Sequence, residues 1–161
     1  MNSRQINIDL FNYNRRPTVE VVVGGLVLGS AHPVRVQSMT NTSTMDTEGS
    51  VEQTLRIVEK GGELVRLTTQ GNREAVNMGC IKEQLVARGC RVPLVADVHF
   101  SSEIAIAAAS VVEKVRINPG NFHKDHEKAR EQFARLVEVC KENGTAIRIG
   151  LNHGSLGDRI T

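Results

Sequence analysis

Two kinds of hydrophobic pattern alternate along this chain. Short apolar runs of strand length are separated by longer stretches in which apolar residues recur at the spacing of an amphipathic helix. The runs predict five strands, at Pro33–Thr40, Glu63–Gln70, Pro93–Phe100, Val112–Asn118 and Ala146–Asn152. The longer stretches predict four helices, at Thr47–Lys60, Arg73–Arg88, Ser102–Ala109 and His126–Asn143. Gly89 and Gly144 follow two of these helices, as is common just past a helix C-terminus.

A β-hairpin is predicted ahead of the first of these strands. Residues 18–30 (TVEVVVGGLVLGS) read as two short strands around the turn signal Gly24-Gly25. Residues 1–17 form a polar N-terminal arm without the apolar segment of a secretory signal. Residues 18–161, the hairpin and the βα units of 33–161, are expected to form one barrel domain in part.

Strands separated by helices require a parallel sheet, either open and doubly wound or closed as a (β/α)8 TIM-type barrel. The phosphate loops of the open class are missing, because Gly24-x4-Gly29 is followed by Ser30 instead of Lys and no G-x-G-x-x-G follows a strand. Polar residues at the strand ends favour the barrel. A barrel has eight units and typically about 250 residues, so the chain is expected to be an incomplete N-terminal fragment.

Composition narrows the function classes. Hydrophobic residues make up 40% and charged residues 24%, typical of a globular protein. A net charge of +2 and few aromatic residues disfavour nucleic-acid binding. No apolar run approaches the roughly 20 residues of a membrane span, and a cytoplasmic location is expected. Cys80, Cys90 and Cys140 form no C-x-x-C pair and are predicted to be buried or half-buried free thiols.

An arginine occupies the same local position in three predicted strands, between two large apolar residues: Arg66, Arg116 and Arg148. Side chains alternate between the faces of a strand, so the apolar neighbours face the helices and the arginines face the barrel interior. Burying unpaired guanidinium groups is costly, and Asp97 is the clearest acid to balance them. The pattern therefore predicts an anionic, phosphorylated substrate, since the guanidinium fork suits phosphate oxygens.

Two alternative roles for these arginines remain open. They could pair with acids on strands outside this chain, or lie at an exposed mouth of the barrel. Arg35 has a similar context but lies farther from its strand end, and we interpret it as structural or variable.

Two histidine-containing patterns lead to different interpretations. Asp97 and His99 lie two positions apart, so their side chains share one face of a strand. Because they lie beside the arginines, they indicate a hydrogen-bonding or proton-handling role. The alternative is a hydrogen-bonded Asp–His pair that only closes the strand. His123, His126 and Glu127 form H-x-x-H-E at a helix start, where a solvated first turn is favoured over a metal site.

Four strand-end segments resemble the 4-hydroxy-3-methylbut-2-enyl diphosphate synthase family of the non-mevalonate isoprenoid (terpenoid) pathway. They are VQSMTNT at Val36–Thr42, PLVADVHF at Pro93–Phe100, VRINPGN at Val115–Asn121 and IRIGLNHGSL at Ile147–Leu156. They occur in the family's order and at about its spacing, and the likeness extends from about Arg16. NHGSLGDRI, at residues 152–160, is closer to the larger plant-type form.

The resemblance implies a barrel that binds 2-C-methyl-D-erythritol 2,4-cyclodiphosphate and helps convert it reductively to 4-hydroxy-3-methylbut-2-enyl diphosphate. It implies diphosphate ligands at Arg66, Arg116 and Arg148. Companion residues around the substrate are implied at Asp97, His99, Asn118 and Asn152. No catalytic residue is assigned.

The resemblance also implies a four-iron–four-sulfur (4Fe-4S) cluster, held by a C-terminal domain that this chain lacks, and ferredoxin or flavodoxin as electron donor. Cys80, Cys90 and Cys140 lie in no matching motif and are not predicted to be cluster ligands, so no metal is expected here. The chain alone is expected to be an inactive part of an oxidoreductase. A homodimer is expected, because missing strands would leave an open sheet edge.

Two alternative functions remain. One is another barrel for anionic or pterin substrates, similar to dihydropteroate synthase. The other is a non-catalytic anion-binding or regulatory module.

Overall fold

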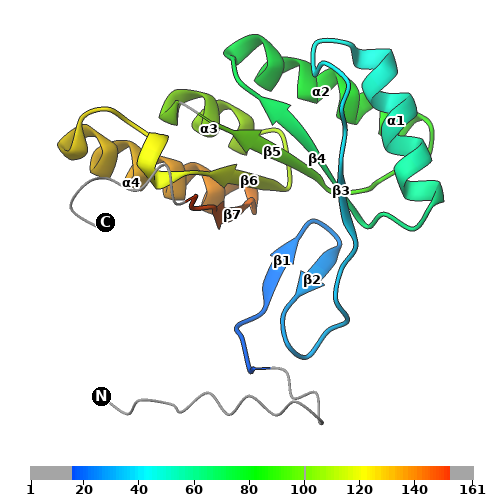
Figure 1. The fold of residues 1–161 in the computed structure, drawn as a ribbon, viewed down its shortest axis with the longest axis horizontal. Helices are drawn as coiled ribbons and strands as arrows, with labels where there is room; N and C mark the ends of the chain where they lie inside the picture. Colours follow the sequence, from blue (N-terminus) through cyan, green and yellow to red (C-terminus); the bar gives the residue numbers. More distant parts are fainter. Residues whose placement is uncertain (1–15, 100, 153–161) are drawn as a thin grey trace.

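The computed structural model describes residues 16–99 and 101–152 and has an α/β architecture. Figure 1 shows the helices as an outer row from α1 to α4 along the sheet, with the β1–β2 hairpin apart from them. The predicted N-terminal arm lies almost wholly outside the described residues, as do Phe100 and the segment after Asn152. The predicted α/β fold, part of a barrel preceded by a hairpin, is confirmed.

The main sheet has five parallel strands in the order β3-β4-β5-β6-β7, the same as their order in the chain. This simple order is the one that a β/α barrel follows around its circumference. The strands are β3 (Gln37–Met39), β4 (Leu64–Thr69), β5 (Leu94–Val98), β6 (Lys114–Ile117) and β7 (Ala146–Ile149).

The connecting helices are α1 (Thr47–Glu59), α2 (Asn72–Ala87), α3 (Ser102–Ala109) and α4 (His126–Asn143). The carboxylate of Asp125 caps α4 by accepting hydrogen bonds from the backbone N–H groups of Glu127 and Lys128, at 2.9 and 3.3 Å. Gly144 ends this helix in the left-handed conformation, with φ of 66°, as expected for a residue without a Cβ.

The hairpin pairs β1 (Val21–Val23) with β2 (Leu26–Leu28) in antiparallel register. Gly24 supplies the positive φ of 57° that the tight turn requires. Val23 is fully buried and packs in a small apolar cluster with Leu64, Val95 and Ala146. These three residues begin or lie early in their strands, so the hairpin covers the N-terminal part of the sheet on the side away from the helices.

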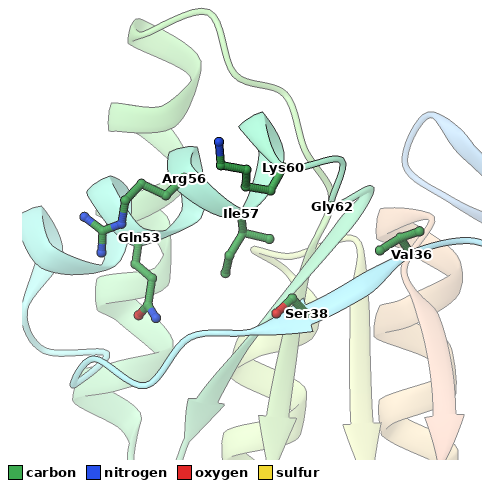
Figure 2. Close-up of a pocket in the computed structure, with 7 residues that line it drawn as sticks. All are labelled: Val36, Ser38, Gln53, Arg56, Ile57, Lys60 and Gly62. Atoms are coloured by element: carbon green, nitrogen blue, oxygen red, sulfur yellow. The ribbon is translucent and has the colours of Figure 1, made fainter.

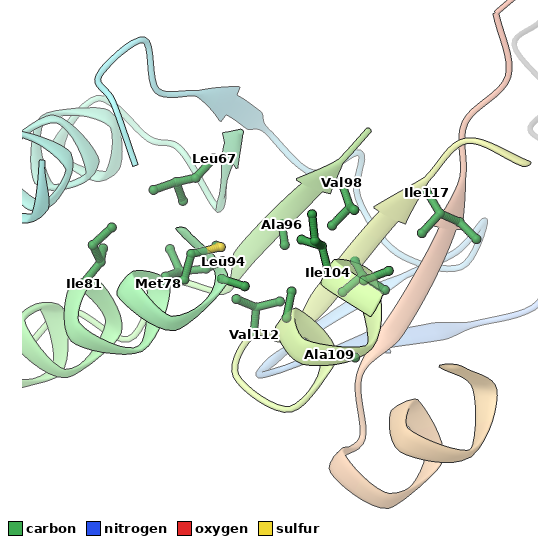
Figure 3. Packing of buried hydrophobic residues seen from close by; sticks show 14 of the residues in the cluster. Leu67, Met78, Ile81, Leu94, Ala96, Val98, Ile104, Ala109, Val112 and Ile117 are labelled. Carbon is green, nitrogen blue, oxygen red and sulfur yellow. The ribbon is translucent and has the colours of Figure 1, made fainter. Parts of the chain in front are cut away.

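The main core lies between the sheet and the helices (Figure 3). Leu67, Ala96 and Ile117 come from three neighbouring strands, and Met78 and Ile104 face them from α2 and α3. Each of these side chains is at most 8% exposed. The helix side of the sheet is therefore mainly apolar, and the charged residues of the strands lie on the opposite face.

All five strands of the main sheet are shorter than the sequence predicts, and two of them begin at least two residues later than predicted. β3 begins at Gln37 instead of Pro33, because the Val36 N–H donates to the Glu63 carboxylate at 2.9 Å. β6 begins at Lys114 instead of Val112, because the Val112 N–H still donates to the Ala108 carbonyl at the end of α3. Among the described helices, none has the length and apolar content needed to cross a membrane.

Candidate functional site

The strand residues that alternate with the helix-side core form what we call the inner face of the sheet. Strand pairing aligns its members in rows, with Arg66 beside Val95 and Lys114, and Asp97 beside Arg116 and Arg148. The inner face thus carries four cationic side chains, Arg66, Lys114, Arg116 and Arg148, and the carboxylate of Asp97. The hairpin residue Val23 packs at the N-terminal end of this face, whereas the row of Asp97, Arg116 and Arg148 lies nearer to the C-terminal ends of the strands.

Asp97 joins two of the predicted arginines. Its side chain is 3% exposed, its Oδ2 lies 3.4 Å from Nε of Arg66, and its Oδ1 lies 3.2 Å from Nη1 of Arg116. The side chains of Arg66 and Arg116 are 27% and 14% exposed. One carboxylate shared by two guanidinium groups leaves a net positive charge, so the acid anchors these arginines without neutralising both.

Arg66 and Arg116 have further contacts that fix their side chains. The sulfur of Met39 lies 3.3 Å from Nε and 3.2 Å from Nη2 of Arg66. Nη2 of Arg116 donates to the carbonyl of Gly150 at 3.4 Å. The backbone of Gly150 lies close against Arg116, because a Cβ at Gly150 would collide with Nε of Arg116. Both guanidinium groups are therefore held in place before any ligand binds.

Arg148 differs from the other two arginines. It lies opposite Arg116 in the parallel register, and so on the inner face, but it is exposed. Arg66 and Arg116 are half-buried, whereas Arg148 matches the alternative of an exposed position at the mouth. The reason is topological, since β7 is the last strand of the sheet and no described strand covers its outer edge.

The remaining predicted site residues lie near the same strand ends. Nε2 of His99 is 3.1 Å from Oδ2 of Asp97. Asn118 is buried, and its Oδ1 accepts a hydrogen bond from the Gly120 N–H at 3.1 Å, which caps the short 3-10 helix η1 (Pro119–Asn121). Asn152 is exposed after β7. The structure thus brings Arg66, Asp97, His99 and Arg116 together, whereas the side-chain oxygen of Asn118 already has a structural partner.

Lys114 and Met39 belong to the inner face, yet the arginine pattern alone does not identify them. Lys114 precedes Arg116 by two positions, so strand alternation is the signal that could have placed both on one face. Burial, and then the positive charge of Arg148, lowers the pKa of Lys114. The contact between Met39 and Arg66 has no sequence signal, because it depends on the register of β3 against β4.

The other candidate ligand groups do not gather into a site. The described residues contain no group of three or more His, Cys, Asp or Glu side chains placed to hold a metal ion. Nδ1 of His123 accepts from the Asp125 N–H at 3.0 Å, a local turn contact. Cys90 is half-buried and Cys140 is buried, which raises the pKa of the Cys140 thiol. Cys80 is exposed, so the prediction of a buried or half-buried thiol is wrong there, because Cys80 lies on a solvent-facing side of α2.

A separate hollow lies on the helix side of the sheet, between β3 and α1 (Figure 2). Arg56 and Lys60 reach it from α1, and Ser38 borders it from β3. None of the predicted site residues lines it. Because β3 is an end strand of the sheet, this hollow marks an open edge and not the strand-end site.

A parallel sheet in chain order, covered by helices on one side and carrying charged residues toward its C-terminal strand ends, defines the class of β/α-barrel proteins. Within this class the model of one family, the GcpE TIM-barrel domain, matches residues 18–161. The chain belongs to this family.

Curated relatives agree with the family match. A protein of Bacteroides thetaiotaomicron is 55% identical over 170 aligned residues, which cover 95% of this chain and 28% of the relative. Relatives from Porphyromonas gingivalis and Leptospira interrogans are 48% and 45% identical. All three are named 4-hydroxy-3-methylbut-2-en-1-yl diphosphate synthase (flavodoxin). The chain therefore spans between about a quarter and 29% of the length of these relatives.

Proposed function

We propose that residues 18–161 supply the N-terminal, substrate-binding part of the barrel of a 4-hydroxy-3-methylbut-2-en-1-yl diphosphate synthase. The whole enzyme, an oxidoreductase, would convert 2-C-methyl-D-erythritol 2,4-cyclodiphosphate reductively to 4-hydroxy-3-methylbut-2-enyl diphosphate. This step belongs to isoprenoid biosynthesis. The family match and the names of the relatives support this function over a pterin-binding barrel or a non-catalytic module.

One observation carries the substrate assignment. Arg66 and Arg116 share the single buried carboxylate of Asp97 on an inner face that also holds Lys114 and Arg148. The excess of positive charge would be balanced by a doubly charged diphosphate, and guanidinium groups bind its oxygens in a planar fork. We propose Arg66, Arg116 and Arg148 as diphosphate ligands, and His99, Asn118 and Asn152 as neighbours of the substrate.

Asp97 has a different role in this proposal. Its two oxygens already face guanidinium groups, and a carboxylate repels a diphosphate. It would therefore act by ordering Arg66 and Arg116 instead of binding the substrate directly. His99, within 3.1 Å of the same carboxylate, would be held by it in a fixed orientation.

Flavodoxin is the proposed electron donor, because the relatives carry it in their names. The family further implies a four-iron–four-sulfur cluster. The described part of this chain does not fit one, since Cys80 is exposed on α2 whereas Cys140 is buried in α4. We therefore propose that the cluster ligands lie on residues outside this chain.

The proposal also includes an assembly and a location. β3 and β7 are the two ends of the described sheet, and in the 161-residue chain taken alone such unpaired edges favour association. A homodimer in the cytoplasm is proposed.

Calorimetric titration of the 161-residue chain with 2-C-methyl-D-erythritol 2,4-cyclodiphosphate tests this function. Arg116→Leu is expected to weaken binding by about 2–4 kcal/mol, as for loss of a largely buried charged partner. Arg56→Leu is the matched control, because Arg56 is exposed on α1 and faces the helix-side hollow. Equal affinities of the Arg116 variant and the unmodified chain would contradict the proposal.

A further inference from the structure

Lys114 occupies an unusual place on the inner face. In the parallel register it lies between Val95 of β5 and Ala146 of β7. Both neighbours belong to the apolar cluster that the hairpin residue Val23 completes. The half-buried stem of Lys114 therefore crosses an apolar layer. This layer lies two residues before Arg116 and Arg148 along their strands, toward the N-terminal end of the sheet.

In the part of the chain that the structure describes, every other half-buried lysine or arginine has an acidic partner. Nζ of Lys82 lies 2.7 Å from Oε1 of Glu113, and Nη1 of Arg35 lies 2.8 Å from Oε1 of Glu63. Lys114 makes no ion pair with any residue of the described ranges 16–99 and 101–152. It is a half-buried ammonium without a carboxylate, in a fold that pairs its structural cations.

The nearby charges make this arrangement less favourable still. Arg148, on the neighbouring strand, is the charged group that adds to burial in lowering the pKa of Lys114. Arg116 follows it on the same face, and the nearest inner-face acid, Asp97, is already shared by two guanidinium groups. A desolvated cation beside like charges destabilises the free protein, and a bound anion would relieve this.

We propose that Lys114 is a further anion-binding residue. It would contact a diphosphate group from the N-terminal side of the sheet, while Arg116 and Arg148 contact the same group from nearer the C-terminal strand ends. This assignment rests on the proposed function and adds a residue to its site. Lysine suits the position, because its ammonium stands on a flexible four-carbon stem that reaches an oxygen from the apolar layer.

The test measures binding of inorganic pyrophosphate to the 161-residue chain by calorimetry, together with the Tm of each variant without ligand. Lys114→Met keeps the apolar stem and removes the charge, Lys114→Arg keeps a charge, and Lys60→Met removes an exposed charge from α1. Lys114→Met is expected to lower affinity about tenfold and to leave Tm unchanged or higher. Lys114→Arg and Lys60→Met are expected to stay within about threefold of the unmodified chain.

Two results would overturn the inference. One is a pyrophosphate affinity of Lys114→Met equal to that of Lys60→Met. The other is loss of affinity in both Lys114 variants together with a lower Tm in both, which assigns Lys114 to packing. Arg116→Leu, measured in parallel, separates this failure from that of the proposed function. If Arg116→Leu weakens binding and Lys114→Met does not, only the role of Lys114 is wrong; if neither does, the diphosphate site itself is wrong.

Discussion

Nη1 of Arg116 lies 3.2 Å from Oδ1 of Asp97, a carboxylate whose side chain is 3% exposed. The two residues are direct neighbours in the parallel register of β5 and β6. The second oxygen of Asp97 faces Nε of Arg66 on β4. A single acid thus links three adjacent strands and orients two of the proposed ligands.

Asp97→Asn is expected to destabilise the fold. The substitution keeps the shape of the side chain but leaves Arg66 and Arg116 without a counter-charge. Because both arginines retain some exposure, the expected loss is about 2–3 kcal/mol of unfolding free energy, at or below the lower end of the range for breaking a buried pair. Urea unfolding monitored by circular dichroism measures it.

Asp46→Asn provides the control for that experiment. Asp46 caps α1 by accepting from the Gly49 N–H at 3.0 Å, and asparagine caps a helix about as well. Its unfolding free energy is expected within about 0.5 kcal/mol of the unmodified chain. If Asp97→Asn proved no more destabilising than Asp46→Asn, the linking role of Asp97 would be wrong.

Glu63 predicts a pH dependence of stability. Hydrogen bonding from the Val36 N–H, and then from Arg35, lowers the pKa of its carboxyl group. A carboxyl whose pKa is lower in the folded state stabilises the fold above its unfolded pKa, and this contribution disappears as the pH falls through the folded pKa. Glu63→Gln should therefore be less stable than the unmodified chain at neutral pH and equally stable in acid.

Thermal unfolding from neutral pH down to the acid limit of solubility measures this difference. Glu59→Gln is the matched control, since Glu59 is exposed and its oxygen lies 3.8 Å from the Lys60 ammonium. It should follow the unmodified chain at every pH. A constant difference between Glu63→Gln and the unmodified chain across the whole range would show that ionisation of Glu63 is not the cause.

The order and type of elements could be predicted from the sequence, because apolar periodicity differs between helices and buried parallel strands. The bounds of α3 and α4 agree with the prediction to the residue. The start of β3 could not be predicted, since it depends on the Glu63 carboxylate taking the Val36 N–H from another part of the chain. A side chain that takes a backbone N–H from a distant segment leaves no pattern in the local sequence.

The residue types of the candidate site could be predicted from the sequence, but the contacts between these residues could be predicted only in part. Alternation places Arg66 and Arg116 on one face, but their common partner Asp97 depends on the stagger between strands. The exposure of Arg148 depends on which strands flank β7, a property of the sheet and not of the segment. The contact of Met39 with Arg66 arises in the same way.

An activity assay of the chain alone tests the proposal that this chain contributes to substrate binding and that the redox centre lies outside it. With 2-C-methyl-D-erythritol 2,4-cyclodiphosphate and dithionite as reductant, the 161-residue chain is expected to form no product, because its described cysteines do not converge on one site. Product analysis by mass spectrometry measures this. Formation of 4-hydroxy-3-methylbut-2-enyl diphosphate above a protein-free control would contradict the proposal that the redox centre lies outside this chain.

The most direct test of the central claim is nitrogen-15 NMR of the arginine Nε–H groups during titration with the cyclodiphosphate. Signals of Arg66, Arg116 and Arg148 are expected to shift together and to saturate at one ligand per chain. Arg35 and Arg88, which pair with Glu63 and with Glu48 and Glu52, should not shift. Shifts confined to those two arginines, or none at all, would contradict an inner face built to bind a diphosphate.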